Sequence, residues 1–408
     1  MVTQQDYWAQ VASTMVDQVV GQEYQLLEEL GRGSYGCLFL GQSLTDGAYV
    51  AVKILSKAGL DPHQLQVQQL EADIQSSLKH DHILSLHRVI QDDDYIFMVM
   101  ELCDQGDLFD FVVRDQELNP VRDEALVKKL FGQILDAMAH MHSKGVFHRD
   151  IKLENILLQS VDDESGDVVC KVADFGLATR DPLSMEFGCG STTYLAPEHF
   201  DDDQNGDYQD CNGELLPYDS AAADVWSLGI LLIALLFGRN PWQEATSLDA
   251  SFAEFRRNPL MLKHQLFPQL SFAGYRFLSS VLSQHPADRP SVKEMQQQFL
   301  AIDRLTVGDG EFDASSVEDE PMTPVDIPLA GAKQPERTSI DSAIFSATVG
   351  GSSWSDMVEE DEFMYQQQQK HHKDIDQQSD LSDHDSPCFD DDDTDMFVHH
   401  QEKESWWL

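Results

Sequence analysis

The sequence has few basic residues, few cysteines and no long apolar run. Lys and Arg total 27 against 72 Asp and Glu, which gives a formal net charge of −45 over 408 residues. Such a charge disfavours nucleic acid and anionic membranes as surface partners. The 6 cysteines contain no Cys-x-x-Cys pair, which argues against structural zinc and indicates a reducing compartment.

Targeting and membrane-spanning segments are also not expected. The N-terminus has no basic stretch followed by an apolar core, so no secretory signal is predicted. The most apolar run, residues 225–238, is too short to cross a bilayer and predicts a buried core helix. We therefore expect a soluble protein of the cytoplasm, with the nucleus as a further location.

One eight-residue stretch, 148–155 (HRDIKLEN), combines an acid, a base and an amide between apolar runs. Asp150 can accept a proton, Lys152 can neutralise a phosphate, and Asn155 can offer an oxygen to a hard cation. Asp174 opens an Asp-Phe-Gly triplet downstream and supplies a second carboxylate for a metal. A lone His-x-Asp is more often a turn, but the full string with its triplet resembles the catalytic loop and metal-binding triplet of protein kinases.

A glycine-rich turn lies upstream, between two strand-like runs. Gly31, Gly33 and Gly36 form a G-x-G-x-x-G pattern, in which missing Cβ atoms let backbone N–H groups approach phosphates. Alone, this pattern also fits a hairpin turn. Its place between two strands favours the kinase glycine loop over a dinucleotide-binding fold. Leu38 stands where the family usually has valine and keeps the lid apolar.

A Val-Ala-Val-Lys strand ends in Lys53, which matches the kinase lysine that holds the α- and β-phosphates. Such a lysine needs an anionic partner. Residues 70–78 predict a helix with Leu70, Ile74 and Leu78 on one face. Glu71 on this helix is the predicted partner of the lysine, and Asp73 is the rival candidate.

The strand predicted over residues 95–100 shows no alternation, so both of its faces should be buried. The kinase resemblance makes Met100 the gatekeeper and makes Glu101 to Cys103 the hinge, whose backbone reads adenine. Asp107 lies where the family places an acid near the ribose and the arginine-binding groove. A helix N-cap is an equally good reading of Asp107.

By the same resemblance, residues 174–198 form an activation segment that ends in Ala-Pro-Glu. Ser191 matches the hydroxyl that bridges the catalytic Asp and Lys in serine/threonine kinases. Phe187 stands four residues earlier, where regulated kinases often carry a phosphorylated threonine. Arg149 nevertheless keeps the basic group that would bind such a phosphate.

Three alternatives follow for activation. Ser184 or Thr192 supplies the phosphate, or Glu186 partly substitutes for it, or activation needs none. We favour the last.

Two pairings typical of the family are expected in the C-terminal half. Asp224 should hold the backbone of the catalytic loop, and Arg289 should pair with Glu198. The strings at residues 188–191 (GCGS) and 237–242 (FGRNPW) are similar to fungal kinases of the Ran/Pat meiosis and nutrient-signalling group.

The chain is expected to have three parts: an N-terminal leader (residues 1–23), a kinase domain (24–302) and an acidic tail (303–408). The tail lacks apolar periodicity and is predicted to be disordered. Its tryptophans, among them Trp406 and Trp407, suggest docking motifs for regulators. An acidic insertion after His199 is predicted to be a flexible surface loop.

The resemblance implies an α+β, bilobal protein-kinase-like fold, with a small antiparallel-sheet N-lobe and a mainly helical C-lobe. ATP would lie between the lobes with Mg²⁺ held by Asn155 and Asp174. Four apolar side chains would sandwich the adenine: Leu30, Leu38, Ala51 and Leu157. Asp150 would take the proton of a serine or threonine hydroxyl on a protein substrate, and Lys152 would steady the γ-phosphate.

For the substrate sequence, Glu154 and Asp107 suggest a basic residue near the acceptor. Two other function classes remain open. A pseudokinase scaffold would not need Lys53, Asp150, Asn155 and Asp174 together, and a small-molecule phosphotransferase would not need the long activation segment.

Overall fold

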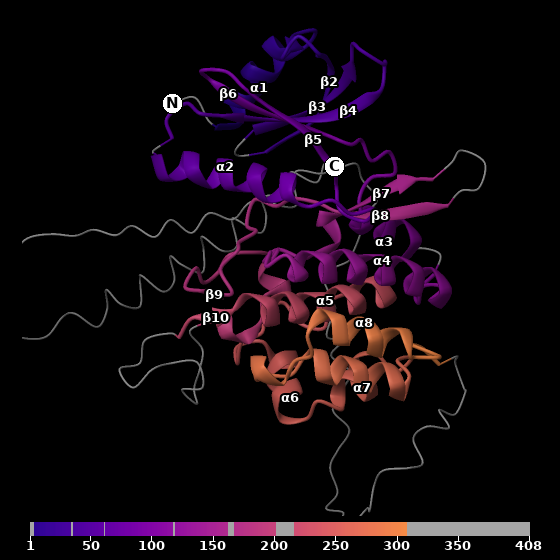
Figure 1. Ribbon diagram of the computed structural model, residues 1–408. Helices are drawn as coiled ribbons and strands as arrows, with labels where there is room; N and C mark the ends of the chain where they lie inside the picture. The colour runs from indigo at the N-terminus through magenta and orange to yellow at the C-terminus, as the bar shows by residue number, and fades with distance from the viewer. Residues whose placement is uncertain are drawn as a thin grey trace, which may run out of the picture. The chain divides into compact units, whose positions relative to one another are not determined.

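A computed structural model describes residues 4–33, 36–60, 62–116, 119–161, 167–200 and 216–307, and all of them belong to one compact unit. Residues 201–215 of the acidic insertion and residues 308–408 of the predicted tail lie outside the described residues. Residues 303–307, predicted as part of the tail, belong to the C-lobe, where Leu305 is buried and Thr306 pairs with Leu270. Within this unit a sheet-rich N-lobe is followed by a mainly helical C-lobe (Figure 1). The predicted α+β, bilobal fold is confirmed.

The N-lobe is built on a six-stranded antiparallel sheet with the order β1-β2-β3-β4-β6-β5. Its strands are β1 (Val19–Val20), β2 (Tyr24–Gly33), β3 (Gly36–Ser43), β4 (Tyr49–Ser56), β5 (Leu86–Gln91) and β6 (Tyr95–Met100). β6 lies between β4 and β5, and all its residues except the first are buried. This burial explains why its sequence does not alternate.

Helix α1 (Gln4–Met15) covers one face of this sheet. Trp8, Val11 and Ala12 are buried there in one apolar cluster with side chains of β2, β3 and β4. The Tyr7 hydroxyl also lies 3.1 Å from Oγ of Ser56 at the end of β4. Because β1 pairs with β2, residues 4–20 add both a helix and a strand to the N-lobe.

Helix α2 (Pro62–Ser77) lies on the other side of the sheet from α1 (Figure 1). Its buried residues are Glu71, Ala72, Ile74 and Gln75. Ile74 and Leu78 of the predicted apolar face are buried, but Leu70 is 42% exposed, so its place on that face is wrong. The helix is rotated so that the carboxylate next in sequence, not the leucine, faces the sheet.

The C-lobe carries six α-helices and four short strands among the described residues. The helices are α3 (Leu108–Gln116), α4 (Glu124–Ser143), α5 (Ser220–Phe237), α6 (Ala250–Arg257), α7 (Phe272–Val281) and α8 (Val292–Leu300). The strands form two antiparallel pairs, β7 (Ile156–Ser160) with β8 (Val168–Val172) and β9 (Leu183–Ser184) with β10 (Tyr218–Asp219).

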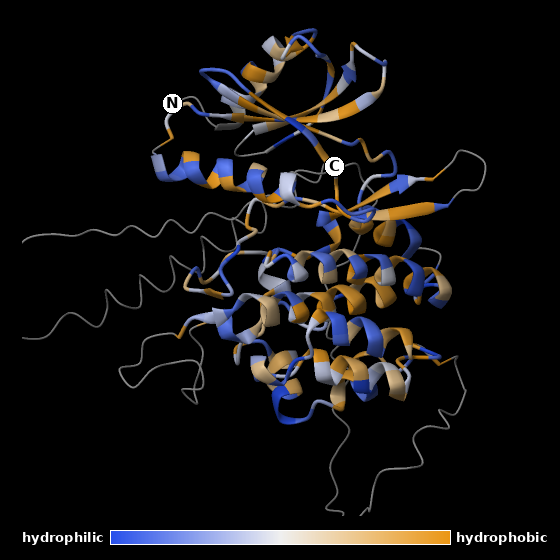
Figure 2. Cartoon of the chain, in the orientation of Figure 1, coloured by the Kyte–Doolittle hydropathy of each residue, from blue (hydrophilic) through white to orange (hydrophobic). Residues whose placement is uncertain are grey.

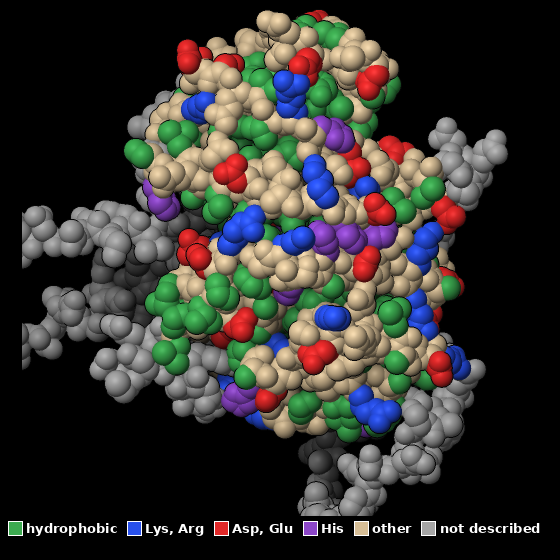
Figure 3. All heavy atoms as spheres, in the orientation of Figure 1, with side chains coloured by type: hydrophobic (Ala, Val, Ile, Leu, Met, Phe, Trp, Pro, Cys, Tyr) green, Lys and Arg blue, Asp and Glu red, His purple; other side chains and the backbone are tan. Residues whose placement is uncertain are grey.

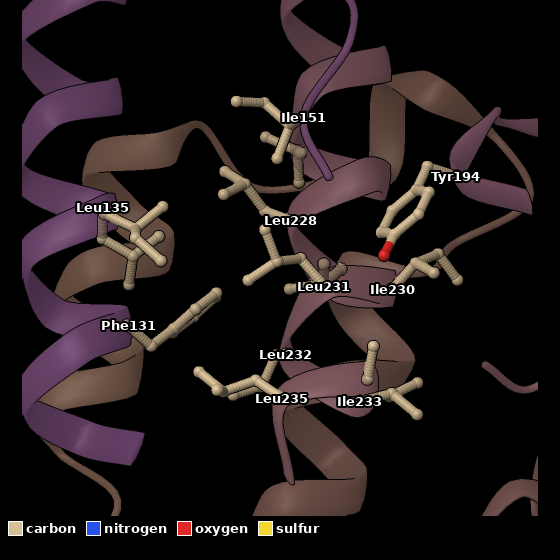
Figure 4. Close-up of a cluster of buried hydrophobic side chains, with 14 of the residues drawn as sticks. Phe131, Leu135, Ile151, Tyr194, Leu228, Ile230, Leu231, Leu232, Ile233 and Leu235 are labelled. Atoms are coloured by element: carbon tan, nitrogen blue, oxygen red, sulfur yellow. The ribbon is translucent and has the colours of Figure 1, made fainter. Parts of the chain in front are cut away.

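Helix α5 is the centre of the C-lobe core. It is long and apolar enough to span a membrane, but 94% of it is buried inside the protein, as expected of a core helix. Figure 2 shows its largely apolar surface, and Figure 4 shows Leu228, Leu231 and Leu235 facing Phe131 and Leu135 of α4. Ile151 of the catalytic loop and Tyr194 of the activation segment join the same cluster, so the core anchors both site segments.

Candidate active site

The predicted catalytic loop brings its acid, base and amide together. Asn155 donates through Nδ2 to the backbone oxygen of Asp150 at 2.8 Å and to its Oδ2 at 3.0 Å. Lys152 Nζ lies 3.3 Å from the same Oδ2 and donates to Oγ of Ser191 at 2.8 Å. Ser191 in turn donates from its backbone N and its Oγ to Asp150 Oδ1, at 3.0 and 3.1 Å. Ser191 therefore bridges Asp150 and Lys152, as the resemblance implies.

Asp224 of α5 holds the backbone of this loop. Its two carboxylate oxygens accept the backbone N–H groups of His148 and Arg149, each at 2.8 Å. Burial acts to raise the pKa of Asp224, but the hydrogen bond from His142 and the backbone donors outweigh it, so the pKa is lowered. Arg149 has a positive φ of 65° and Asp174 one of 60°, a conformation that L-residues hold only where the surroundings impose it.

Lys53 on β4 is buried against two carboxylates. Its Nζ lies 2.7 Å from Glu71 Oε1 and 3.5 Å from Asp174 Oδ1. Asp73, the rival partner, instead accepts from Gln69 on the same helix. Burial works against the lysine charge, but Glu71 and Asp174 outweigh it, so the pKa of Lys53 is raised and the ammonium stays charged.

The predicted metal ligands have the chemistry that Mg²⁺ requires. Asn155 Oδ1 is buried and accepts no hydrogen bond from a described residue, which leaves a carbonyl oxygen free for a cation. Asp174 supplies a carboxylate with 7% side-chain exposure. Oxygen ligands of this kind suit Mg²⁺, which when bound would offset charge on ATP phosphates.

An apolar cluster lies between the sheet and β7, at the position predicted for adenine. Leu38, Ala51, Met100 and Leu157 are buried in it, and Leu30 and Cys103 pack against it partly buried. Burial raises the pKa of the Cys103 thiol to about 12.

The predicted glycine loop is the hairpin between β2 and β3. Gly31 pairs with Leu38, and Gly33 pairs with Gly36. The pattern thus joins two strands, as its sequence context predicted.

The activation segment includes β9, and side-chain contacts hold it both at β9 and at its C-terminal end. Arg149 donates to Oε2 of Glu186 at 2.5 Å and to Oγ of Ser184 at 3.1 Å. Leu183 and Met185 alternate with these two residues and are each 59% exposed, on an apolar surface over β9 and β10 (Figure 3). At the end of the segment, Glu198 pairs with Arg289 through contacts of 2.5 and 2.7 Å.

Two acids, one before the catalytic loop and one within it, are candidates for binding a basic substrate residue. Asp107 is 3% exposed and its Oδ1 accepts the backbone N–H of Asp110 at 2.8 Å, so it caps the start of α3. Burial raises its pKa to about 7, and Asp110 and Glu154 add to this. One oxygen of Glu154 is buried without a hydrogen bond from a described residue, and burial raises the pKa of this carboxyl.

Two features of the site were not identified in the sequence. Gly190 has φ +109°, and a Cβ there would lie 2.7 Å from the backbone oxygen of Arg149. The only hint of this close approach in the sequence was that a glycine precedes Ser191. The Glu101 side chain pairs with Lys171 at 3.0 Å, and no local pattern links these residues because 70 positions separate them.

The bilobal fold, the Lys53–Glu71 pair and the bridged Asp150 define a protein kinase domain. The chain belongs to the protein kinase family, since residues 24–300 match the protein kinase domain. It is 33% identical over 304 residues to the serine/threonine-protein kinase ksp1 of Schizosaccharomyces pombe, covering 73% of this chain and 60% of that protein. It is 32% identical over 304 residues to a negative regulator of sexual conjugation and meiosis from the same yeast, covering 72% and 63%.

The similarity extends beyond fungi. The maternal embryonic leucine zipper kinase of Xenopus tropicalis is 33% identical over 276 residues, which cover 67% of this chain and 38% of that protein. The matched region spans less than two thirds of each of these three relatives. The predicted resemblance to serine/threonine protein kinases, with fungal relatives, is confirmed.

Proposed function

We propose that this protein is a serine/threonine kinase that transfers the γ-phosphate of ATP to hydroxyl groups of protein substrates. One observation carries the proposal: Ser191 bridges Asp150 and Lys152, while Lys53 is paired with Glu71. A scaffold that only binds nucleotide gains nothing from an acceptor-side bridge of this kind. The bridge therefore supports phosphate transfer over a pseudokinase role.

The residues divide the chemistry between them. Asp150 presents carboxylate oxygens that orient an incoming hydroxyl and accept its proton. Lys152, whose ammonium lies between Asp150 and Ser191, neutralises charge on the transferred group. Lys53 holds the phosphates of ATP, and Mg²⁺ bound by Asn155 and Asp174 would add positive charge there. Most of the acceleration then comes from positioning and electrostatics.

For the substrate we propose a protein segment with a basic residue near the acceptor. The paired acids Asp107 and Glu154 support it, because each would gain a counter-ion for a poorly solvated carboxyl. Arginine-selective kinases place a further carboxylate in the buried helix where this chain has Ala234, so we expect a preference for one basic residue. A peptide array with no enrichment of Arg or Lys would contradict it.

Location and partners are further proposals. Within the described residues, Cys37, Cys103 and Cys170 are free thiols, which supports a reducing compartment such as the cytoplasm or nucleus. The acidic tail, with Trp406 and Trp407 near its end, is proposed to dock regulators.

The test is transfer of labelled phosphate from magnesium-ATP to a mixed serine/threonine peptide library. The matched control is Asp150→Asn, which keeps the shape of the side chain but cannot take the proton. Incorporation that disappears in the control supports the kinase. The opposite outcome is an unaltered protein that is folded and binds ATP but transfers no phosphate, alone or with added cell extract. That outcome would support the scaffold reading.

A further inference from the structure

A buried ion pair joins the hinge to the strand that leads into Asp174. Glu101 follows β6 and is the first hinge residue, and Lys171 is the fourth residue of β8. Lys171 Nζ lies 3.0 Å from Glu101 Oε2, and the two side chains are 10% and 15% exposed. Water is therefore largely excluded from the contact, and its charges are screened little.

Glu101 also has a second contact on the N-lobe side. Its Oε1 accepts the backbone N–H of Ser85 at 2.7 Å, and its own N–H donates to the Ser85 oxygen at 3.0 Å. The carboxylate thus has one oxygen on the N-lobe and one on β8. Replacing Glu101 by glutamine removes the ion pair but leaves an oxygen that can still accept the Ser85 N–H.

The strand that carries Lys171, β8, forms backbone hydrogen bonds along both of its edges. Lys171 is in register with Leu157, which forms part of the adenine-side cluster. The next residue, Val172, exchanges backbone hydrogen bonds with the segment before Ser85, through His82 O and Leu84 N, both at 2.9 Å. Asp174 lies three residues after Lys171, and its carboxylate is 3.5 Å from Lys53.

Burying such a pair is an inefficient way to gain stability. The desolvation of two charges offsets most of their attraction, and apolar replacements of buried pairs are often neutral or stabilising. An ion pair with a second hydrogen bond does, however, fix geometry. Through Glu101 it sets the distances between three chain segments. Here those segments carry the adenine side, the N-lobe loop and the metal-binding acid.

We propose that Glu101 and Lys171 form a latch that holds the hinge in register with β8 and so couples adenine binding to the position of Asp174. Both are positioning residues, because neither side chain touches the predicted nucleotide site. The proposal deepens the proposed function and rests on it for the place of ATP. Without the latch, the hinge and Asp174 move more independently, and the affinity for magnesium-ATP falls.

The test measures nucleotide binding by calorimetry in the full chain, with no acceptor present. Glu101→Gln and Lys171→Met are each expected to weaken magnesium-ATP about fivefold, and the double variant no further, since both remove the same pair. Lys171→Arg should retain the affinity of the unaltered protein. Lys129→Met is the matched control, because it removes an exposed contact of 2.6 Å to Asp167, just before β8, and should change nothing.

A purely structural role is separated by a second readout. If the pair couples the two ends of the site, the gain in ATP affinity on adding Mg²⁺ should shrink in both single variants. An unchanged gain, additive losses in the double variant, or tighter binding in the single variants would each overturn the latch. Because binding needs no transfer, a protein that shows the expected losses but transfers no phosphate would contradict the proposed kinase activity and leave the latch standing.

Discussion

Arg149 of the catalytic loop and Glu186 of the activation segment form an ion pair with Nη1 and Oε2 2.5 Å apart. The arginine side chain is 7% exposed and the glutamate 63%. In the family, this arginine binds a phosphate on the activation segment. Here the Glu186 carboxylate binds the arginine in place of a phosphate. The ring of Phe187 packs against Tyr218, with 5.7 Å between the ring centroids.

We therefore predict that the protein transfers phosphate without prior phosphorylation of its activation segment. Glu186→Gln should lower kcat about fivefold, since one ionic hydrogen bond with a solvent-exposed partner contributes about 1 kcal/mol. The measurement is the rate of phosphatase-treated protein purified from bacteria. Met185→Ala, at an exposed neighbouring side chain, is the control and should retain the full rate. A treated protein that is inactive until an upstream kinase is added would contradict the prediction.

Gly190→Ala should abolish most activity. The residue has φ +109°, a conformation that only glycine adopts readily, and an added Cβ would lie 2.7 Å from Arg149 O. The backbone must then shift Ser191 away from Asp150, so we expect kcat to fall at least about tenfold. Gly132→Ala is the control, because nothing lies within 4 Å of its added Cβ. Equal kinetics for the two variants would show that the close approach at residue 190 is dispensable.

Selectivity for a basic residue should depend on pH through Asp107. Its pKa, raised by burial to about 7, makes the carboxyl mostly neutral at pH 6 and mostly charged at pH 8. The ratio of kcat/KM for a peptide with upstream arginine over its alanine version should therefore rise with pH, by up to about tenfold. Asp107→Asn keeps an oxygen to cap Asp110 but cannot ionise, and should flatten this dependence. A slope that persists in the variant would assign the effect to another group, such as Glu154.

The candidate site residues could be predicted from the sequence because each lies in a short local string. The catalytic loop, the Asp-Phe-Gly triplet and the Val-Ala-Val-Lys strand need only neighbouring residues to be recognised. Lys53 and Glu71 were paired from their order along the chain, and the contact of 2.7 Å agrees with that expectation.

Side-chain partners that depend on rotation or register were not predictable in the same way. Ile74 and Leu78 are buried as their shared face predicted, but Leu70 is exposed, and its neighbour Glu71 is buried against Lys53 instead. The Glu101–Lys171 contact depends on how β8 lies beside the hinge, which no local pattern encodes. The burial of Trp8, at 2% exposure, depends on the sheet on which α1 packs, which lies outside the leader itself.

His199 should make the folded domain less stable in acid. Its ring is buried, and burial lowers its pKa to about 4, whereas an unfolded histidine takes up a proton near its ordinary value of 6.5. Between these values the unfolded chain binds more protons, so stability falls as the pH decreases from about 6.5 toward 4. This one residue should remove roughly 2 kcal/mol of unfolding free energy between pH 7 and pH 5.

The check is urea unfolding of the unaltered protein and of His199→Phe at both pH values. Phenylalanine keeps a ring against Tyr218, whose centroid lies 4.1 Å away, and it abandons no hydrogen bond at Nδ1, which has no described partner. The variant should therefore lose roughly 2 kcal/mol less stability on acidification. His87→Gln, at an exposed histidine, is the control and should follow the unaltered protein. If His199→Phe and the unaltered protein lose the same stability, the buried ring does not stay neutral in the folded state, and protonation there must be accommodated by Glu198 beside it.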